Sequence, residues 1–303
     1  MTQPKSYRYR VVDVFTERAL EGNALAVFPD ASGLDDATMQ KIARELNLSE
    51  TTFVTPATRS DCVANVRIFT PSRELIFAGH PTIGTSFVLL DEDIVPKASE
   101  RFRLEEKVGP VPVRVEMGEH PLSRPLDCPL FWLTTPPIRA GRTYDPKRCA
   151  QALGLAPSDL LDVPPQIMSA GMPAAFVALK DQATVDRAWL DSAGLAVFKE
   201  GATEPISVFV FAPTATGAYS RMFAPEFGIV EDPATGSATG PLAAFMLQHN
   251  LVAGADGTRF ISEQGVKMER RSILHVQLHG ERGADGIEVG GYVTPLADAV
   301  MKF

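Results

Sequence analysis

The sequence repeats itself after about half its length, and this repeat restricts the possible folds more than any other feature. The repeat is carried by RIFTP (67–71) and GHPTIGTS (79–86) in the first half, and by RMFAP (221–225) and EDPATGSA (231–238) in the second. The second pair of segments aligns Pro81 with Pro233 and Gly84 with Gly236. A period of half a chain indicates two copies of one folding unit rather than a solenoid of short repeats. We therefore predict a duplicated α+β scaffold with one site between its halves.

The composition is that of a globular protein, with 45% hydrophobic and 22% charged residues among 303. The net charge of −8 argues against nucleic acid as a partner, because neutralising phosphates requires clustered Lys and Arg. The N-terminus lacks the apolar core of a signal peptide, and no apolar run approaches about 18 residues. We therefore expect no membrane partner and a cytoplasmic location. Cys62, Cys128 and Cys149 are far apart and lie in no Cys/His cluster, so we expect neither a metal site nor a disulfide framework.

Glu50 follows directly after a predicted helix. Apolar residues recur at helical spacing between residues 39 and 46, and this amphipathic pattern ends at residues 47–49. Residues 51–54 then predict a strand, which puts Glu50 at a helix-to-strand junction. For an isolated glutamate in such a place, a solvated loop carboxylate is the better interpretation.

One helix is predicted after each repeated loop, and both helices lack a charged face. Such helices are normally buried, so we expect each inside its own domain. Pro241 lies within the second helix and predicts a kink or a local break, because proline lacks an N–H and crowds the preceding turn. The proline-rich residues 121–137 predict the crossing between halves. We expect a first domain of residues 1–120 with a terminal strand at about 290–303, and a second domain of residues 121–289.

Each repeated loop places a polar side chain, His80 or Asp232, before a proline that we expect to open a helix. The free N–H groups of a first helical turn carry roughly half a positive charge. Two such ends together would suit an anion, and a substrate carboxylate is the expected one. Each residue also has a structural alternative: an N-cap for Asp232, a buried imidazole bonded to a carbonyl for His80, and close packing for the glycines. The duplication of both loops favours a site.

Three chemistries use residues of these kinds. A serine triad of Ser237, His80 and Asp232 has the right residue types, but TGSATG is not the GxSxG elbow and Asp232 is only five residues before Ser237. A two-thiol racemase needs a cysteine at each helix start, and neither residues 78–86 nor residues 231–239 contain one. Proton transfer by a carboxylate and an imidazole remains open.

Several blocks of the chain resemble the PhzF family, the phenazine-biosynthesis isomerases and their relatives. These blocks are EGN (21–23), NLSET (47–51), FAGHP (77–81) and residues 221–242. The resemblance implies the fold of diaminopimelate epimerase, in which two similar domains related by a pseudo-twofold axis each wrap a barrel-like, mainly antiparallel sheet around a central helix. The active site would lie in the cleft. The absent cysteine pair separates this chain from the epimerase branch.

The resemblance also implies an activity. The PhzF isomerase shifts a double bond in trans-2,3-dihydro-3-hydroxyanthranilic acid without a metal or an organic cofactor. By the family pattern, Glu50 would be the general acid/base that takes a proton from one carbon and returns it at another, assisted by His80, Asp232 and Ser237. The residues expected to hold the substrate are Asn23, Gly79, Pro81, Thr235 and Gly236. Relatives are often homodimers, so we expect a homodimer here.

One position departs from the family pattern. Proline stands at 233, where the phenazine enzyme has alanine after the aspartate. We therefore expect the substrate to be trans-2,3-dihydro-3-hydroxyanthranilic acid or a related cyclic acid. The competing interpretation is that the chain is a non-catalytic protein with the same fold, either one that binds a small carboxylate or a regulatory protein. Retention of Glu50, His80, Asp232 and Ser237 together favours an enzyme.

Overall fold

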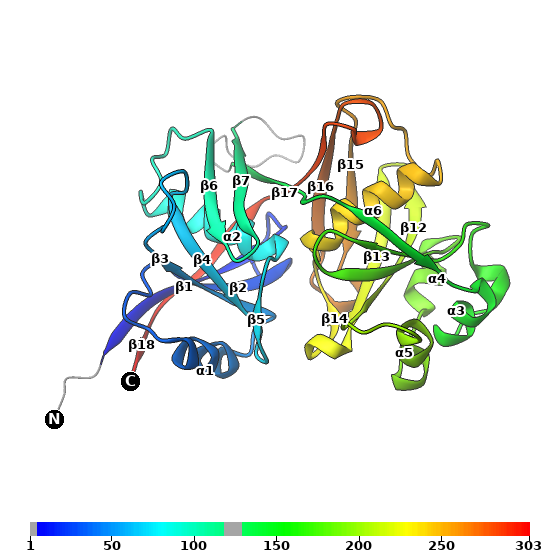
Figure 1. Cartoon of the computed structure of the whole chain (residues 1–303), viewed down its shortest axis with the longest axis horizontal. Helices are drawn as coiled ribbons and strands as arrows, with labels where there is room; N and C mark the ends of the chain where they lie inside the picture. Colours follow the sequence, from blue (N-terminus) through cyan, green and yellow to red (C-terminus); the bar gives the residue numbers. More distant parts are fainter. Residues whose placement is uncertain (1–4, 118–128) are drawn as a thin grey trace. The chain divides into compact units, whose positions relative to one another are not determined.

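The computed structural model describes residues 5–117 and 129–303 (Figure 1). The chain divides into two compact units, Met1–Thr134 with Gly290–Phe303, and Thr135–Val289. The predicted boundary at residues 120 and 121 lies outside the described residues, as does most of the predicted crossing segment. The division into two separately folding domains stays a prediction.

The first unit is a mixed sheet with mainly antiparallel neighbours. Its strands are β1 (Ser6–Val14), β2 (Asn23–Phe28), β3 (Glu50–Thr55), β4 (Ala64–Phe69), β5 (Glu74–Leu75), β6 (Arg101–Glu106), β7 (Gly109–Glu116), β8 (Leu130–Thr134) and β18 (Val293–Lys302). Antiparallel pairing joins β18 to β1 and β1 to β2, β3 to β4, β4 to β5, β6 to β7 and β7 to β8. Parallel pairing joins β2 to β3 and β4 to β6. The predicted α+β class is confirmed.

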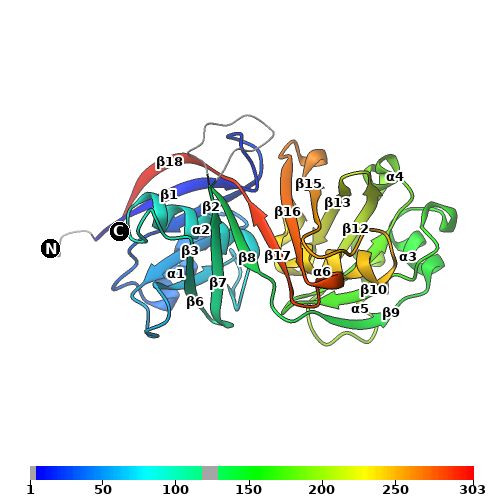
Figure 2. The same ribbon diagram turned by 90° about the horizontal axis from the view of Figure 1, so that it is seen from above.

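One helix, α2 (Gly79–Asp91), is central to the first unit. It contacts β1, β2, β3, β8 and β18, and Figure 2 shows it close to the first three of these. All residues of α2 except Phe87 and Asp91 are buried. Gly84 permits this close approach, because a Cβ there would lie 2.6 Å from the Leu25 side chain and 2.7 Å from that of Val14. The predicted buried helix is confirmed.

The other helix of the first unit, α1 (Asp36–Leu46), is the amphipathic helix predicted from the spacing of apolar residues. Asp35 caps it by accepting a hydrogen bond of 2.8 Å from a backbone N–H of the first turn. Its buried face includes Met39, Ile42 and Ala43. The helix ends at Asn47, whose φ of 51° is left-handed. β3 begins shortly afterwards at Glu50, so this junction is also confirmed.

The second unit has its own mixed sheet. Its strands are β9 (Arg139–Thr143), β10 (Gln166–Ser169), β11 (Pro173–Ala178), β12 (Ser207–Thr214), β13 (Gly217–Ala224), β14 (Ile229–Asp232), β15 (Arg259–Gln264), β16 (Ser272–His279) and most of β17 (Gly286–Gly291). Its α-helices are α3 (Pro146–Ala152), α4 (Gln182–Arg187), α5 (Ser192–Lys199) and α6 (Gly236–Gln248). Antiparallel pairing joins β9 to β10, β10 to β11, β12 to β13, β13 to β14 and β15 to β16. Parallel pairing joins β11 to β12 and β13 to β15.

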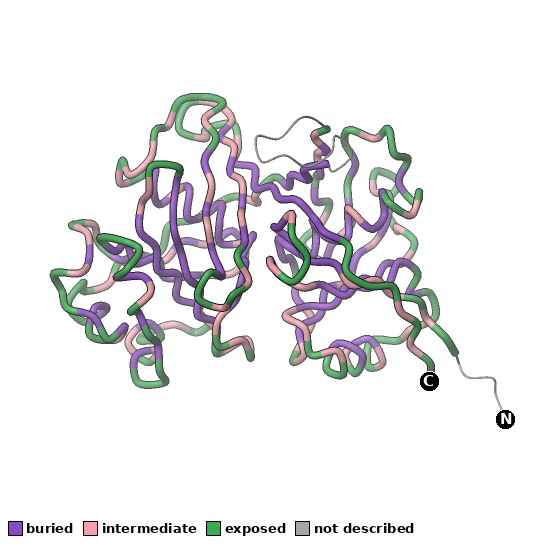
Figure 3. The backbone as a smooth tube through the Cα atoms, turned by 180° about the vertical axis from the view of Figure 1, so that it is seen from behind, coloured by how far each residue is buried: buried purple, intermediate pink, exposed green. Residues whose placement is uncertain are grey.

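Helix α6 is the central helix of the second unit. It contacts β10, β11 and β16, and its Phe245 packs into an aromatic core with Phe176 and Phe211. Figure 3 shows the strands of each unit mainly buried, with the exposed backbone concentrated at turns and chain ends. The helix continues through Pro241, so a local break does not occur there, whereas a kink stays a prediction. One proline removes a single intrahelical hydrogen bond, and burial of the surrounding residues outweighs that loss.

The two units share one internal plan, as the repeat predicts. In the first unit the order β1–β2–β3–β4–β6–β7 has its parallel pairs at β2/β3 and β4/β6; in the second, β10–β11–β12–β13–β15–β16 has them at β11/β12 and β13/β15. The strands that follow the central helices are similar in sequence, RFRLEE in β6 and RFISEQ in β15. Within β4 and β13, Arg67 and Arg221 each bind a glutamate, Glu74 and Glu231.

The detailed alignment of the two loops predicted above is wrong. Helix α2 begins at Gly79, two residues before Pro81, whereas α6 begins at Gly236, three residues after Pro233. The helix starts therefore align Gly79 with Gly236 and His80 with Ser237. Proline is tolerated at the third position of α2 because the first four N–H groups of a helix have no intrahelical partner.

A hydroxyl in each central helix supports this new alignment. Thr82 donates to the carbonyl of Ala78 at 2.7 Å, and Thr239 donates to the carbonyl of Thr235 at 2.9 Å. Ala78 and Thr235 are the N-cap residues of the two helices. Sequence alone matched the two prolines, although they occupy different places relative to their helices.

Candidate active site

The predicted residues form two groups, one in each unit. The first group consists of Asn23, Glu50, Gly79, His80 and Pro81. The parallel pairing of β2 and β3 puts Leu25 opposite Glu50, so Asn23 and Glu50 lie where neighbouring strands begin. Helix α2 contacts both strands and begins with Gly79 and His80. Residues from three separate parts of the chain are thereby brought together.

Glu50 and His80 are in contact inside the first unit. Their side chains are only 10% and 4% exposed, and Nε2 of His80 lies 3.2 Å from Oε2 of Glu50. The distance is that of an ion pair, but the atoms are not aligned for a hydrogen bond. Burial lowers the pKa of His80 from 6.5 to about 3. The imidazole is therefore neutral at neutral pH. Because the Glu50 side chain is buried, the interpretation of Glu50 as a solvated loop carboxylate is wrong.

Asn23 determines which nitrogen of His80 carries the proton. Its side-chain amide nitrogen lies 3.4 Å from Nδ1 of His80. An amide nitrogen can only donate, so Nδ1 accepts and the proton of the neutral ring is on Nε2. That N–H is on the side of Glu50. The pair thus joins a carboxylate, able to accept a proton, to a neutral imidazole. The structural alternative for His80, a bond to a backbone carbonyl, is not what the structure contains, because its ring nitrogens lie against the side chains of Asn23 and Glu50.

The start of α2 has no side-chain cap. Ala78 makes no side-chain cap hydrogen bond, and the N–H groups of Gly79 and His80 precede the first intrahelical bond. These two amides are the donors expected for an anion at this helix start. Pro81 has no N–H, so it can contribute shape but no hydrogen bond.

The second group lies at the start of α6. Asp232 ends β14, Thr235 is the N-cap of α6, and Gly236 and Ser237 begin the helix. The Thr235 hydroxyl donates to Oδ2 of Asp232 at 2.5 Å. Asp232 is therefore not the N-cap, which corrects the structural alternative considered for it. Among the described residues the Ser237 hydroxyl has no hydrogen-bond partner, so the structure does not link it to Asp232 as part of a triad.

Gln264 holds the second group together, and we did not predict it. Its buried amide nitrogen donates to the carbonyl of Asp232 at 2.7 Å and to the Thr235 hydroxyl at 3.0 Å. Its amide oxygen accepts from the Thr235 N–H at 3.2 Å. A signal for this residue was present in the sequence, because Gln264 ends the RFISEQ copy of RFRLEE.

Thiol and metal chemistry find no support in the described part of the chain. Burial raises the pKa of Cys149 to about 12, and that of Cys62 is also raised, mainly by burial. Cys128 lies outside the described residues. No group of three or more His, Cys, Asp or Glu in residues 5–117 and 129–303 is arranged to hold a metal ion. Within the same ranges, no helix is long and apolar enough to cross a membrane.

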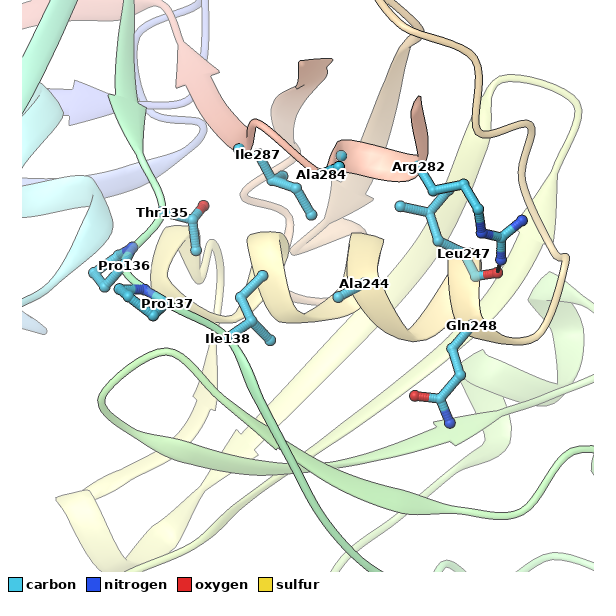
Figure 4. Close-up of a pocket in the computed structure, with 12 residues that line it drawn as sticks. Thr135, Pro136, Pro137, Ile138, Ala244, Leu247, Gln248, Arg282, Ala284 and Ile287 are labelled. Atoms are coloured by element: carbon cyan, nitrogen blue, oxygen red, sulfur yellow. Dashed lines mark hydrogen bonds between the residues drawn. The ribbon is translucent and has the colours of Figure 1, made fainter. Parts of the chain in front are cut away.

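A cavity of about 450 Å³ in the second unit lies away from these side chains (Figure 4). Figure 4 shows Pro136 and Ile138 on one side of α6 and Arg282 and Ile287 on another. None of the predicted site residues lines it. This cavity is therefore separate from the candidate site.

Comparisons with known proteins identify the family of the chain. Residues 12–299 match the PhzC-PhzF family, described as phenazine biosynthesis-like protein. The chain is 35% identical over 288 residues to a trans-2,3-dihydro-3-hydroxyanthranilate isomerase of Pseudomonas aeruginosa, covering 94% of this chain and 95% of that protein.

Solved structures resemble the whole chain. A PhzF-family protein of Bacillus anthracis superposes with a TM-score of 0.85 at 22% identity, covering 98% of this chain and 99% of the other. A predicted epimerase of Pseudomonas aeruginosa gives 0.79 at 34% identity, covering 97% and 99%. The chain therefore belongs to the PhzC-PhzF family and is an enzyme of the isomerase class.

Proposed function

We propose that this isomerase moves a proton, and with it a double bond, within a small carboxylate and without a cofactor. The substrate proposed is trans-2,3-dihydro-3-hydroxyanthranilate or a related cyclic acid. The observation that carries the proposal is the buried contact of 3.2 Å between Glu50 and His80, in a chain whose relative is named for that isomerisation.

Glu50 is proposed as the general acid/base. Its carboxylate takes a proton from one carbon of the substrate and returns it at another, so atoms balance and nothing is oxidised or reduced. His80 keeps its ring neutral, and in our proposal its contact of 3.2 Å through Nε2 positions the Glu50 carboxylate.

Substrate binding is proposed for the remaining residues. The amides of Gly79 and Gly236 belong to the first turns of the two central helices, where a carboxylate is stabilised by free N–H groups and the helix dipole. Asp232 and Ser237 are proposed to assist the reaction, and Thr235 to bind substrate beside them. In this proposal Asn23 contacts the substrate and also fixes the tautomer of His80.

Solvent-deuterium incorporation tests the proposal. A panel of cyclic dienoic and enolic carboxylates is incubated with the protein in D₂O and followed by NMR. We expect deuterium at carbon and a shifted double bond for at least one member, both lost in Glu50→Gln. Glu45→Gln is the matched control, because Glu45 is exposed on α1 and the chemical change is the same. Incorporation that persists in Glu50→Gln would remove Glu50 from the mechanism.

The cytoplasmic location and the homodimer are proposals as well. The homodimer is expected from the family resemblance, and sedimentation equilibrium of the full chain would decide it. A monomer at micromolar concentration would contradict it.

A further inference from the structure

The carboxyl group of Glu106 is buried near the start of α2, and the proposed mechanism does not use it. Glu106 ends β6 and is only 3% exposed. Its Oε1 lies 2.5 Å from the Thr82 hydroxyl, and its Oε2 has no hydrogen-bond partner among the described residues. Burial raises its pKa to about 8, and no charged neighbour contributes to that shift.

Counting protons around Thr82 gives the state of this carboxyl group. The Thr82 hydroxyl lies 2.5 Å from Glu106 Oε1 and 2.7 Å from the carbonyl oxygen of Ala78. A hydroxyl has one proton, and a carbonyl oxygen can only accept. With an ionised Glu106, one of these two short oxygen contacts would contain no proton. With a protonated Glu106, the acid donates to Thr82 and Thr82 donates to Ala78.

The second unit uses a neutral side chain at the equivalent position. In β6 and β15 the parallel pairs Ala64–Leu104 and Ala218–Ser262 show the same register, which aligns Glu106 with Gln264. Gln264 donates to the Thr235 hydroxyl and to the Asp232 carbonyl at the start of α6. A neutral donor thus stabilises the start of one central helix, and the proton count indicates the same for the other.

Charged groups around Glu106 are engaged elsewhere. Along β6, Glu105 accepts hydrogen bonds from the backbone N–H groups of Thr58 and Arg59. Arg103 on the same strand pairs with Asp61, and Lys107 just beyond it pairs with Glu74. On the neighbouring strands Arg67 pairs with Glu74 and Arg114 pairs with Glu116. On α2 the titratable groups are His80, which is neutral and lies against Glu50, and Asp91, which pairs with Arg10. Within residues 5–117 and 129–303, no cation is therefore placed to stabilise an ionised Glu106.

We propose that Glu106 acts as a neutral carboxylic acid, a positioning residue that donates through Thr82 to the carbonyl of Ala78 and so fixes the first turn of α2. That turn contains Gly79 and His80. Ionisation of Glu106 removes the donor, leaves a buried charge and loosens the turn. The consequence for catalysis rests on the proposed function, whereas the protonation state does not.

The protonation state can be measured without activity. In protein labelled with ¹³C at glutamate carboxyls, we expect one carboxyl resonance to titrate with a midpoint of about 8, and this resonance to be absent in Glu106→Gln. Relative to Glu106→Gln, the stability of the wild type should fall as pH rises from 4.5 toward 8, because the folded wild-type chain keeps a proton that the unfolded chain releases. Glutamate carboxyls that all titrate below pH 6 would overturn the proposal.

Activity and a matched pair of variants test the positioning role. Glu106→Gln should keep the rate at neutral pH, since an amide N–H also donates to Thr82, and should lose the alkaline limb on which the wild-type rate falls about tenfold per pH unit. Glu105→Gln should keep that limb. An alkaline limb unchanged in Glu106→Gln would refute the role. If no substrate is turned over at all, the proposed function fails while the titration still decides the state of Glu106.

Discussion

Replacing Arg221 with methionine is expected to destabilise the second unit by about 4 kcal/mol, because it leaves the Glu231 carboxylate, which is only 15% exposed, and three backbone carbonyls without their partner. The Arg221 side chain is 7% exposed and binds both oxygens of Glu231 at 2.8 Å. Its remaining nitrogen donates to three carbonyls at the end of α4, those of Val185, Asp186 and Ala188. Removing one partner of a buried ion pair costs about 3–5 kcal/mol, and methionine recovers only part of the packing.

The duplicated fold offers a matched control. Arg67 binds Glu74 at 2.8 Å in the first unit, but its side chain is 23% exposed and its second partner, Asp36, is largely exposed. Arg67→Met should therefore cost only about 1–2 kcal/mol, since Glu74 keeps its ion pair with Lys107 and water solvates Asp36. Glu231 directly precedes Asp232, so Arg221→Met should also weaken substrate binding.

Urea denaturation of Arg221→Met, Arg67→Met, Glu231→Leu and the double variant Arg221→Met/Glu231→Leu measures these values. The double variant should lose less than the sum of the single changes, by about 2 kcal/mol, because neither charge is then left alone. Equal costs for Arg221→Met and Arg67→Met, or a cost below about 1 kcal/mol for the former, would refute the reasoning.

Two further predictions concern the site. Because burial lowers the pKa of His80 from 6.5 to about 3, the unfolded chain takes up a proton that the folded chain refuses, so stability is lost as pH falls below 6.5, by about 2 kcal/mol at pH 5. Urea denaturation of the wild type and of His80→Gln at pH 7 and pH 5 should show the wild type losing about 2 kcal/mol relative to the variant on going to pH 5; a difference between the two proteins that does not change with pH would contradict it. Gln264→Leu leaves the Asp232 carbonyl and the Thr235 N–H buried without their partner, so we expect a cost of about 2–4 kcal/mol and a raised KM. Thermal and kinetic measurements that match the wild type would show that Gln264 does not hold this loop.

Much of the fold was predictable because its signals are local or duplicated. The spacing of apolar residues predicted the amphipathic helix α1. The repeat at Arg67 and Arg221 predicted two equivalent folding units, and these arginines make equivalent contacts in β4 and β13. The helix starts were mispredicted because proline is compatible with several positions of a first turn. Which position it takes depends on where the chain leaves the sheet, and a short motif does not contain that information.

The site was only partly predictable for a related reason. Glu50 is buried because β2 and β3 pair in parallel, a contact between distant segments, and from its neighbours alone it looked like a solvated glutamate. Only the family resemblance singled it out. Gln264 and Glu106 were missed because their hydrogen bonds reach back 29 and 24 residues, although the shared RFRLEE and RFISEQ strands were visible. A repeat should therefore be searched for equivalent polar residues as well as for equivalent elements.

The central claim is that Glu50 transfers the proton, and the kcat of Glu50→Gln, together with its affinity for the substrate or product, tests it most directly. Glutamine keeps the size of the side chain but cannot accept and return a proton, so we expect kcat to fall by at least about 10²- to 10⁴-fold. The dissociation constant, measured by calorimetry, should stay within a few-fold of the wild type, because the helix-start amides are untouched. A Glu50→Gln protein with wild-type kcat would contradict the account.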